Sequence, residues 1–215
     1  MIAIKRSRLA VVTASLSATL ALSACGPTND DIAHSESSTA MYQAYNDSMT
    51  KMHSEMMLGM GYNDPDSAFT QGMLGHHLGA VDMAKIQLKY GKDPEMLQLA
   101  QKIIDAQEVE IEQMQKWLNS HPDVAAPMAD TGAMQQAYAT GMNDMHGEMT
   151  LGITDPNPDM AFARGMLPHH RGAVDMAEVQ LEYGKDPEML QLAQEIIAAQ
   201  QPEIEQMQNL SLIHI

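Results

Sequence analysis

The sequence predicts an all-α protein in which two tandem helical hairpins form a four-helix bundle, with a methionine-rich helix ahead of each hairpin. A shift of 93 residues aligns residues 66–115 with 159–208, and 38 of the 50 paired positions are identical, so the chain contains an internal duplication. Within each copy, apolar residues recur at alternating spacings of four and three, which places them on one face of a helix. No segment of the sequence shows the alternating pattern of a β-strand.

The composition indicates a globular core built with few aromatic rings. Hydrophobic residues make up 45% of the 215 residues and aromatic residues only 4%, whereas methionine alone occurs 21 times. Flexible thioethers must therefore fill much of the core. Twelve basic residues stand against 28 acidic ones, for a formal net charge of −16. Such a surface repels phosphate backbones, which excludes nucleic acid as a partner, and it attracts cations.

Residues 1–24 are predicted to be a bacterial secretory signal. Basic residues precede an apolar run at 9–22 that is too short to span a bilayer. The run ends in Leu-Ser-Ala-Cys, which resembles a lipoprotein processing site and predicts that Cys25 is lipidated and becomes the mature N-terminus. Cys25 is the single cysteine, so soft metal ligands elsewhere must be methionines. Because Asp does not follow Cys25, the same resemblance implies a lipoprotein anchored in the outer membrane of the cell envelope and facing the periplasm.

The folded part follows in the order tether, repeat, linker, repeat. Residues 25–40 are polar and lack periodic apolar positions, so they are predicted to be a flexible tether. Repeat 1 spans 41–118 and repeat 2 spans 134–215. The segment 119–133 contains two prolines and a glycine and is predicted to be the linker. The two repeats are expected to form one domain.

Capping residues predict where the helices begin and end. A cap residue followed by proline opens the second and third helix of each repeat, and Gly91 and Gly184 stop the second helix. Only three residues separate the second helix from the third, so the two must be antiparallel. The cap pairs are Asp64-Pro65, Asp93-Pro94, Asn157-Pro158 and Asp186-Pro187.

The hairpin register brings polar residues into one layer, at a common depth in both repeats. Facing residues of the first hairpin are expected to have numbers that sum to about 184, within one helical turn. His76 and His77 then face Gln107 and Glu108, with Glu110 in the adjoining turn. The candidate metal layer consists of Met73, His76, His77, Glu110, Met166, His169, His170 and Glu203.

This layer has the chemistry of a copper site. Imidazole and thioether suit copper, Cu(I) in particular, whereas hard ions prefer oxygen ligands. The glutamates are expected either to complete a site or to orient a histidine ring. The alternative is that His76 and Gln107 hydrogen-bond across the core while the methionines pack; a His-His pair beside methionine, present twice, favours metal. Four residues are expected to lie behind the ligands: Gln107, Gln200, Met83 and Met176.

A second set of candidate metal ligands lies on the methionine-rich helices. A histidine interrupts a stripe of methionines on one helical face, at the same place in both repeats. Packing against the bundle and metal binding explain this pattern equally well. The stripes are Met49, Met52, His53 and Met56 in repeat 1, and Met142, Met145, His146 and Met149 in repeat 2.

Two paired motifs resemble a known bacterial family. Met-x-x-His-His occurs at 73–77 and 166–170, and Gln-x-x-Glu-Ile-x-x-Met at 107–114 and 200–207. Both are similar to the motifs of the family called domain of unknown function 305, over roughly residues 40–208. The resemblance implies a ferritin-like helical bundle, and some members are exported copper-binding proteins linked to copper tolerance.

The second copy departs from the first at two prolines. Pro168 replaces Gly75, and Pro202 replaces Val109. Proline inside a helix removes a hydrogen bond and kinks the chain, so the two His-His pairs are expected to be presented differently.

Three hypotheses of function remain. The favoured one is an envelope lipoprotein without enzymatic activity that binds copper for buffering, tolerance or transfer to a partner protein, with Cu(I) favoured and Cu(II) as the alternative ion. The second is a ferritin-like dinuclear oxidase or peroxidase, although such sites use more glutamates than these motifs supply. The third is a structural or adaptor module whose methionine-rich faces bind another helix.

Overall fold

The computed structural model of the protein describes residues 29–122 and 126–213, with side chains from Glu36 to Leu210 within these ranges. The predicted signal peptide and the lipidation site Cys25 lie outside the described residues. The described part contains six helices and no strand, which confirms the predicted all-α helical bundle. The helices are α1 (Asn29–Met60), α2 (Pro65–Tyr90), α3 (Pro94–Ser120), α4 (Thr131–Gly152), α5 (Pro158–Tyr183) and α6 (Pro187–Ile213).

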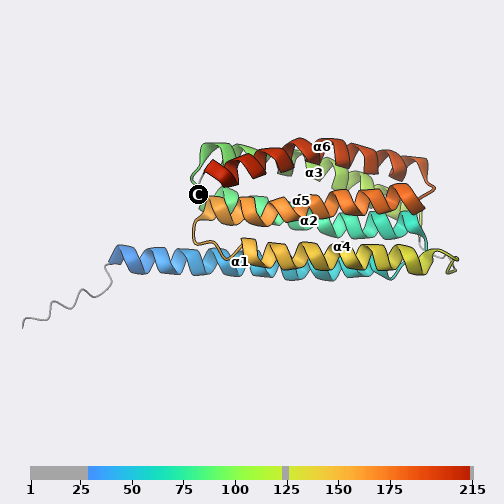
Figure 1. The fold of residues 1–215 in the computed structure, drawn as a ribbon, viewed down its shortest axis with the longest axis horizontal. Coiled ribbons are helices and arrows are strands. Elements are labelled where there is room, and N and C mark those ends of the chain that lie inside the picture. The colour runs from blue at the N-terminus through green and yellow to red at the C-terminus, as the bar shows by residue number, and fades with distance from the viewer. Residues whose placement is uncertain (1–28, 123–125, 214–215) are drawn as a thin grey trace, which may run out of the picture.

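The helices are arranged in three layers of two (Figure 1). The central layer consists of α2 and α5, and through it the two repeats pack on each other. The predicted hairpins are completed by α3 and α6, which cover one side of the central layer. The methionine-rich helices α1 and α4 cover the other side and form a layer of their own.

Helix α1 begins earlier than expected. The segment 29–40, predicted to belong to a flexible tether, is helical, so that prediction is wrong for these residues. No glycine or proline occurs from residue 29 to residue 58, so nothing in the backbone stops the helix from continuing toward the N-terminus. In Figure 1, α1 consequently extends beyond the ends of its neighbours.

The caps and turns lie where the sequence predicts them. The Asp64 side chain accepts a hydrogen bond from the backbone N–H of Ser67 at 2.9 Å, which satisfies a free donor at the start of α2. At the end of α2, the N–H of Gly91 donates to the carbonyl oxygen of Gln87 at 2.7 Å. Residues 91–93 then reverse the chain, and α3 packs back along α2.

Close contacts at glycines hold α1 against α2. A Cβ added to Gly59 would lie 2.5 Å from the backbone nitrogen of Gly72. A Cβ added to Gly79 would lie 2.6 Å from Sδ of Met52. Both distances are far below van der Waals contact. A side chain at either position would therefore force a shift of the neighbouring helix or of the Met52 side chain. The close approach buries the methionine stripe of α1 against the central layer.

A reciprocal pair of buried carboxylates ties the two repeats together. Asp159, in the first turn of α5, accepts hydrogen bonds from Nε2 of Gln87 at 2.6 Å and from the N–H of Lys92 at 3.0 Å. Asp66 of α2 makes the equivalent bond to Nε2 of Gln180 at 2.6 Å and also binds the turn after α5. Hydrogen bonds to charged groups contribute about 1.5–3 kcal/mol each. The turn of each hairpin is thus held by the opposite repeat.

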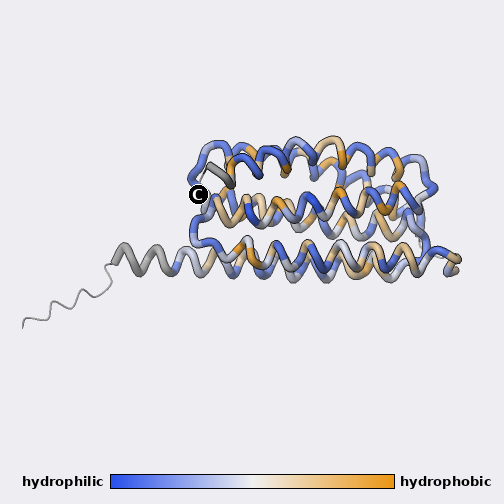
Figure 2. The backbone as a smooth tube through the Cα atoms, viewed as in Figure 1, coloured by the Kyte–Doolittle hydropathy of each residue, from blue (hydrophilic) through white to orange (hydrophobic). Residues whose placement is uncertain are grey.

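Hydrophobic residues are distributed along all six helices and alternate with hydrophilic ones (Figure 2). The buried side chains form one continuous core to which every helix contributes. In the described part of the chain, no helix is both long and apolar enough to cross a bilayer.

Candidate metal centre

Four histidines meet in the core where α2 packs on α5. The side chains of His76 and His77 from α2, and of His169 and His170 from α5, are completely buried. The rings of His76 and His169 lie 3.7 Å apart between their centroids. Imidazoles from opposite repeats therefore meet at a common depth in the core.

Hydrogen bonds across the repeat boundary orient His76 and His169. Nε2 of His76 lies 3.0 Å from the backbone oxygen of His169, and Nε2 of His169 lies 3.1 Å from the backbone oxygen of His76. A carbonyl oxygen can only accept, so Nε2 of each neutral ring carries the proton and Nδ1 carries a lone pair. Both Nδ1 atoms are buried and have no hydrogen-bond partner among the described residues.

The second histidine of each pair is oriented by a carboxylate. Nε2 of His77 donates to Oε2 of Glu110 at 2.7 Å, and Nε2 of His170 donates to Oε2 of Glu203 at 2.8 Å. Here too Nδ1 is buried without a hydrogen-bond partner in the described part of the chain. All four core imidazoles therefore leave the same nitrogen, Nδ1, buried and unpartnered among the described residues.

Burial keeps the central rings neutral. Loss of solvation lowers the pKa of His76 and of His169 well below the ordinary value for histidine. Neighbouring imidazoles lower both pKa values further, while the hydrogen bonds to the backbone oxygens act in the opposite direction. The neutral ring is the form that binds metals.

Consecutive histidines are spaced so that one ion fits between their rings. The centroids of His76 and His77 are 6.1 Å apart, and those of His169 and His170 are 6.0 Å apart. A metal lies about 2.0–2.1 Å from an imidazole nitrogen, so this spacing is compatible with one ion bound by both rings of a pair. At 3.7 Å, by contrast, the rings of His76 and His169 leave no room for an ion between them. The geometry favours one ion per repeat over one ion shared by the two central rings.

The predicted companions of the histidines are also buried. Met73 and Met166 lie one turn before the His-His pairs and are inaccessible to solvent. Gln107 and Gln200 are buried as well, and Oε1 of each has no hydrogen-bond partner among the residues described.

The structure also places the remaining residues that were expected around the histidines. Met83 and Met176 reach toward the opposite repeat: Cε of Met176, for example, lies 3.1 Å from the position of a Cβ at Gly72. Glu108, expected to face the histidines, is exposed, so Glu110 alone makes the contact on α3. The rotation of α3 about its own axis accounts for this difference.

The prolines of the second copy do not disturb the symmetry of the His-His pairs. The expected difference in presentation is absent from the hydrogen bonds, which agree within 0.1 Å between the copies (2.7 and 2.8 Å to the glutamates). Helix α5 continues through Pro168, and α6 through Pro202. The contacts of the rings across the core hold them in place despite the missing backbone donors.

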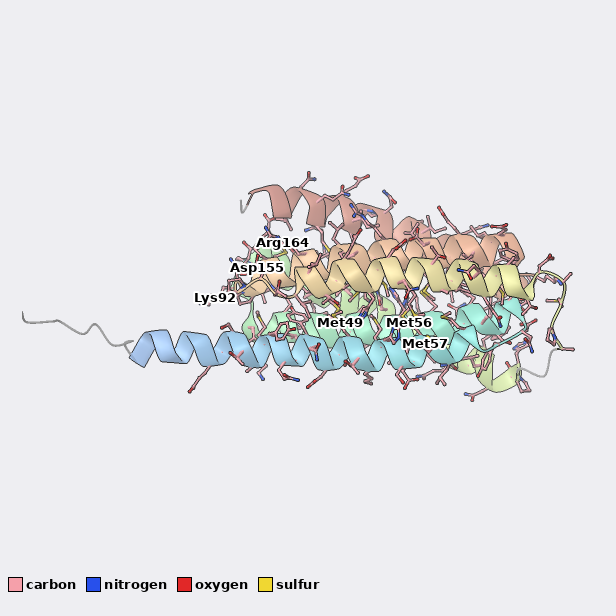
Figure 3. All side chains as sticks on the ribbon, turned by 60° about the horizontal axis from the view of Figure 1, so that its bottom comes forward. Met49, Met56, Met57, Lys92, Asp155 and Arg164 are labelled. Atoms are coloured by element: carbon pink, nitrogen blue, oxygen red, sulfur yellow. The ribbon has the colours of Figure 1, made fainter. Side chains whose placement is uncertain are left out.

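The two methionine stripes meet at the seam between α1 and α4. The rings of His53 and His146 lie 5.4 Å apart, and both histidines are half-buried. Met49 and Met56 lie between α1 and α4 in the view of Figure 3. The stripe methionines are all buried: Met49, Met52, Met56, Met142, Met145 and Met149.

No three His, Cys, Asp or Glu side chains come close enough together to hold a metal ion within the described ranges. The candidate sites instead offer two histidines and a buried methionine one helical turn before them, which together are a soft ligand set.

The family comparison matches the segment that carries the His-His pairs. The model of a family described as Domain of unknown function (DUF305) matches residues 66–211, more than half of the chain. The chain belongs to this family. Both Met-x-x-His-His motifs and both glutamates fall within the matched segment, which confirms the resemblance seen in the sequence.

Several solved structures are similar to this chain. CopM in its Cu(II)-bound form is 32% identical, with a TM-score of 0.53, over 70% of this chain and 97% of that chain. CopM also matches in its Cu(I)-bound and silver-bound forms. A DUF305 fragment from Deinococcus radiodurans is 26% identical, with a TM-score of 0.53, over 70% of this chain and 97% of that chain.

Among curated proteins, an uncharacterized protein of Acanthamoeba polyphaga mimivirus is 40% identical over 52 residues, which are 24% of this chain. The match spans only 34% of that relative's length.

Proposed function

We propose that the protein binds copper, with one Cu(I) ion at each His-His pair, and that it buffers the ion or passes it to a partner protein. The observation that carries this proposal is the state of the four core imidazoles. Every Nε2 is bonded to a carbonyl or carboxylate oxygen, while every Nδ1 is buried and has no hydrogen-bond partner in the described part of the chain. Metal-ligating histidines characteristically donate their second ring N–H in this way.

The ligand set supports copper over harder ions. Met73 and Met166 add thioether sulfur on the turn before the histidines, and soft sulfur with neutral imidazole suits Cu(I). In this arrangement Glu110 and Glu203 orient His77 and His170 instead of binding the ion directly. The relative CopM has been solved with Cu(I), Cu(II) and silver bound.

The cellular setting follows from the N-terminal sequence. A signal at 1–24 ending before Cys25 supports a lipoprotein anchored in the outer membrane and facing the periplasm. In that compartment a thiol ligand would be prone to disulfide formation, whereas imidazole and thioether would not. The net charge of −16 favours a cation as cargo.

Titration of the mature chain with Cu(I), against a competing chelator, tests the proposal. Replacing His76 and His77 by Ala is expected to remove one bound ion, and replacing His169 and His170 as well is expected to remove a second. His121→Ala changes an exposed histidine at the end of α3 and serves as the matched control. Unchanged stoichiometry after all four core replacements, in protein that retains its helical circular dichroism, would contradict the proposal.

A further inference from the structure

We propose a further metal site at the seam between α1 and α4, where His53 and His146 together hold one soft monovalent ion. It is separate from the His-His pairs, and it rests on the proposed function only for the identity of the ion, Cu(I) or its analogue Ag(I). Because each repeat supplies one of the two histidines, there is one such site per chain, and neither repeat forms it alone.

The geometry of the two rings fits a shared ion. Their centroids are 5.4 Å apart, wider than the 3.7 Å contact of the core rings His76 and His169. Nδ1 of His53 and Nδ1 of His146 are both buried, and neither has a hydrogen-bond partner among the described residues. A buried ring nitrogen without a partner is costly unless something binds it. One ion between the two rings would satisfy both nitrogens.

Helical spacing places methionine next to this histidine pair in both repeats. Met56 lies one turn after His53, and Met142 lies one turn before His146. Both methionines line the same apolar cavity of about 10 Å³, a size that holds roughly one water-sized particle. Met60 and Met176 also line this cavity. Sulfur from α1 and α4 is therefore gathered at the place where the two stripes meet.

The duplication places methionine on the other flank of the pair too, but with one difference. The 93-residue shift relates Met56 to Met149 and Met142 to Met49, whereas the counterpart of Met60 is Ile153. Cγ2 of Ile153 lies 3.0 Å from the Cβ position of Gly165, which is the counterpart of Gly72 in the lining of the cavity. The ion is therefore expected on the flank of Met56 and Met142.

The seam site differs from the core sites in access. The core histidines are completely buried, while His53 and His146 are half-buried in the outer layer. An ion reaches the seam without separation of α2 from α5. The seam site is expected to take up metal before the core sites do.

Counting ions by native mass spectrometry, after loading the mature chain with Ag(I) or Cu(I), tests the shared site. His53→Ala and His146→Ala are each expected to lose one ion, and the double variant is expected to lose the same single ion. Met142→Leu, which nearly conserves volume, is expected to weaken the binding of that ion. Met57→Leu is the matched control for the loss of one sulfur, because Met57 is 46% exposed on α1, the helix of His53, and does not line the cavity.

The outcomes separate this proposal from the proposed function. Loss of two ions in the double variant would mean that each stripe binds its own ion, and loss of none would mean that the seam binds none; either result overturns the shared site. The variant with all four core histidines replaced by Ala should still bind the seam ion, which supports the proposal. A different result would separate the two proposals. If the variant without the four core histidines binds no ion, while the seam variants bind as many ions as the unaltered chain, the core sites are supported and the seam site is contradicted.

Discussion

The two histidines of a core pair are held by different acceptors. His76 donates to a backbone carbonyl of the opposite repeat, while His77 donates to the carboxylate of Glu110 in its own repeat. A carboxylate raises the basicity of the ring that it orients. Burial acts on His76 in the other direction and lowers its pKa. Each pair thus combines a ring oriented by a charged acceptor with a ring that stays unprotonated in mild acid.

Removing the charge of Glu110 tests the role of the carboxylate. Glu110→Gln keeps an oxygen that can accept from His77 but removes the negative charge, and changes of this kind cost about 10–100-fold in metal affinity. We expect weaker Cu(I) binding at one core site with the number of ions unchanged, measured by chelator competition. Glu108→Gln, on the exposed face of the same helix, should leave the affinity unaltered. A lost ion instead of a weakened one would identify Glu110 as a direct ligand.

The lowered pKa of His76 and His169 also predicts how the metal-free protein responds to acid. Above the ordinary histidine pKa of about 6.5, these rings are neutral both folded and unfolded. Below that pH these two histidines bind protons in the unfolded chain but not in the native core. The free energy of unfolding therefore decreases as the pH falls.

Urea unfolding between about pH 7.5 and about pH 5, with a chelator present, measures this effect. His76→Gln removes one of the titrating rings, so its free energy of unfolding should fall less steeply below pH 6.5 than that of the unaltered chain. Parallel curves for the two proteins would show that His76 is not neutral in the native state.

At the scale of single helices, much of the fold could be predicted because local signals agree. The Asp-Pro caps, Gly91 and the short turn at 91–93 leave the second and third helix only an antiparallel arrangement. The contact between His77 and Glu110 departs from the predicted register by less than one turn. Loop length cannot specify the rotation of α3 about its axis, which depends on packing, and for this reason Glu108 was placed wrongly.

Glycines that permit close helix contact have a different role from those on free surfaces. Gly59→Ala would place a Cβ 2.5 Å from the backbone of α2, and backbone cannot move aside as a side chain does. We expect a loss of roughly 1–3 kcal/mol in the free energy of unfolding, the usual cost of overpacking. Gly147→Ala on α4 meets nothing within 4 Å and should raise stability by about 0.5–1 kcal/mol. Equal effects in thermal or urea unfolding would argue against close packing of α1 on α2.

At the scale of the whole molecule, the placement of one repeat on the other could not be derived from the sequence. Periodicity within a repeat describes faces of helices, but it does not say which face meets the second copy. Three features depend on that placement: the contact between His76 and His169, the seam of His53 with His146, and the carboxylate clasp. The carboxylate clasp is the pair of hydrogen-bonded side chains Asp66 and Asp159, each of which binds the opposite repeat. A signal for the clasp was present, since an Asp follows the capping proline and a glutamine interrupts the apolar seam in both copies.

The clasp and the shared histidine layer predict that the two repeats unfold together. Asp66 and Asp159 each hold the hairpin turn of the other repeat, so unfolding of one repeat breaks hydrogen bonds of the other and exposes the apolar core that the two share. The single tryptophan, Trp117, lies in α3 and reports on repeat 1 alone, whereas far-UV circular dichroism reports on all six helices. We expect the two signals to give coincident urea transitions, as a two-state protein does.

Asp159→Ala removes the bonds to Gln87 and Lys92 and should move both transitions to lower urea together. A fluorescence transition separated from the circular dichroism transition would show that the repeats are independent units, and it would remove the structural basis for metal sites built from both.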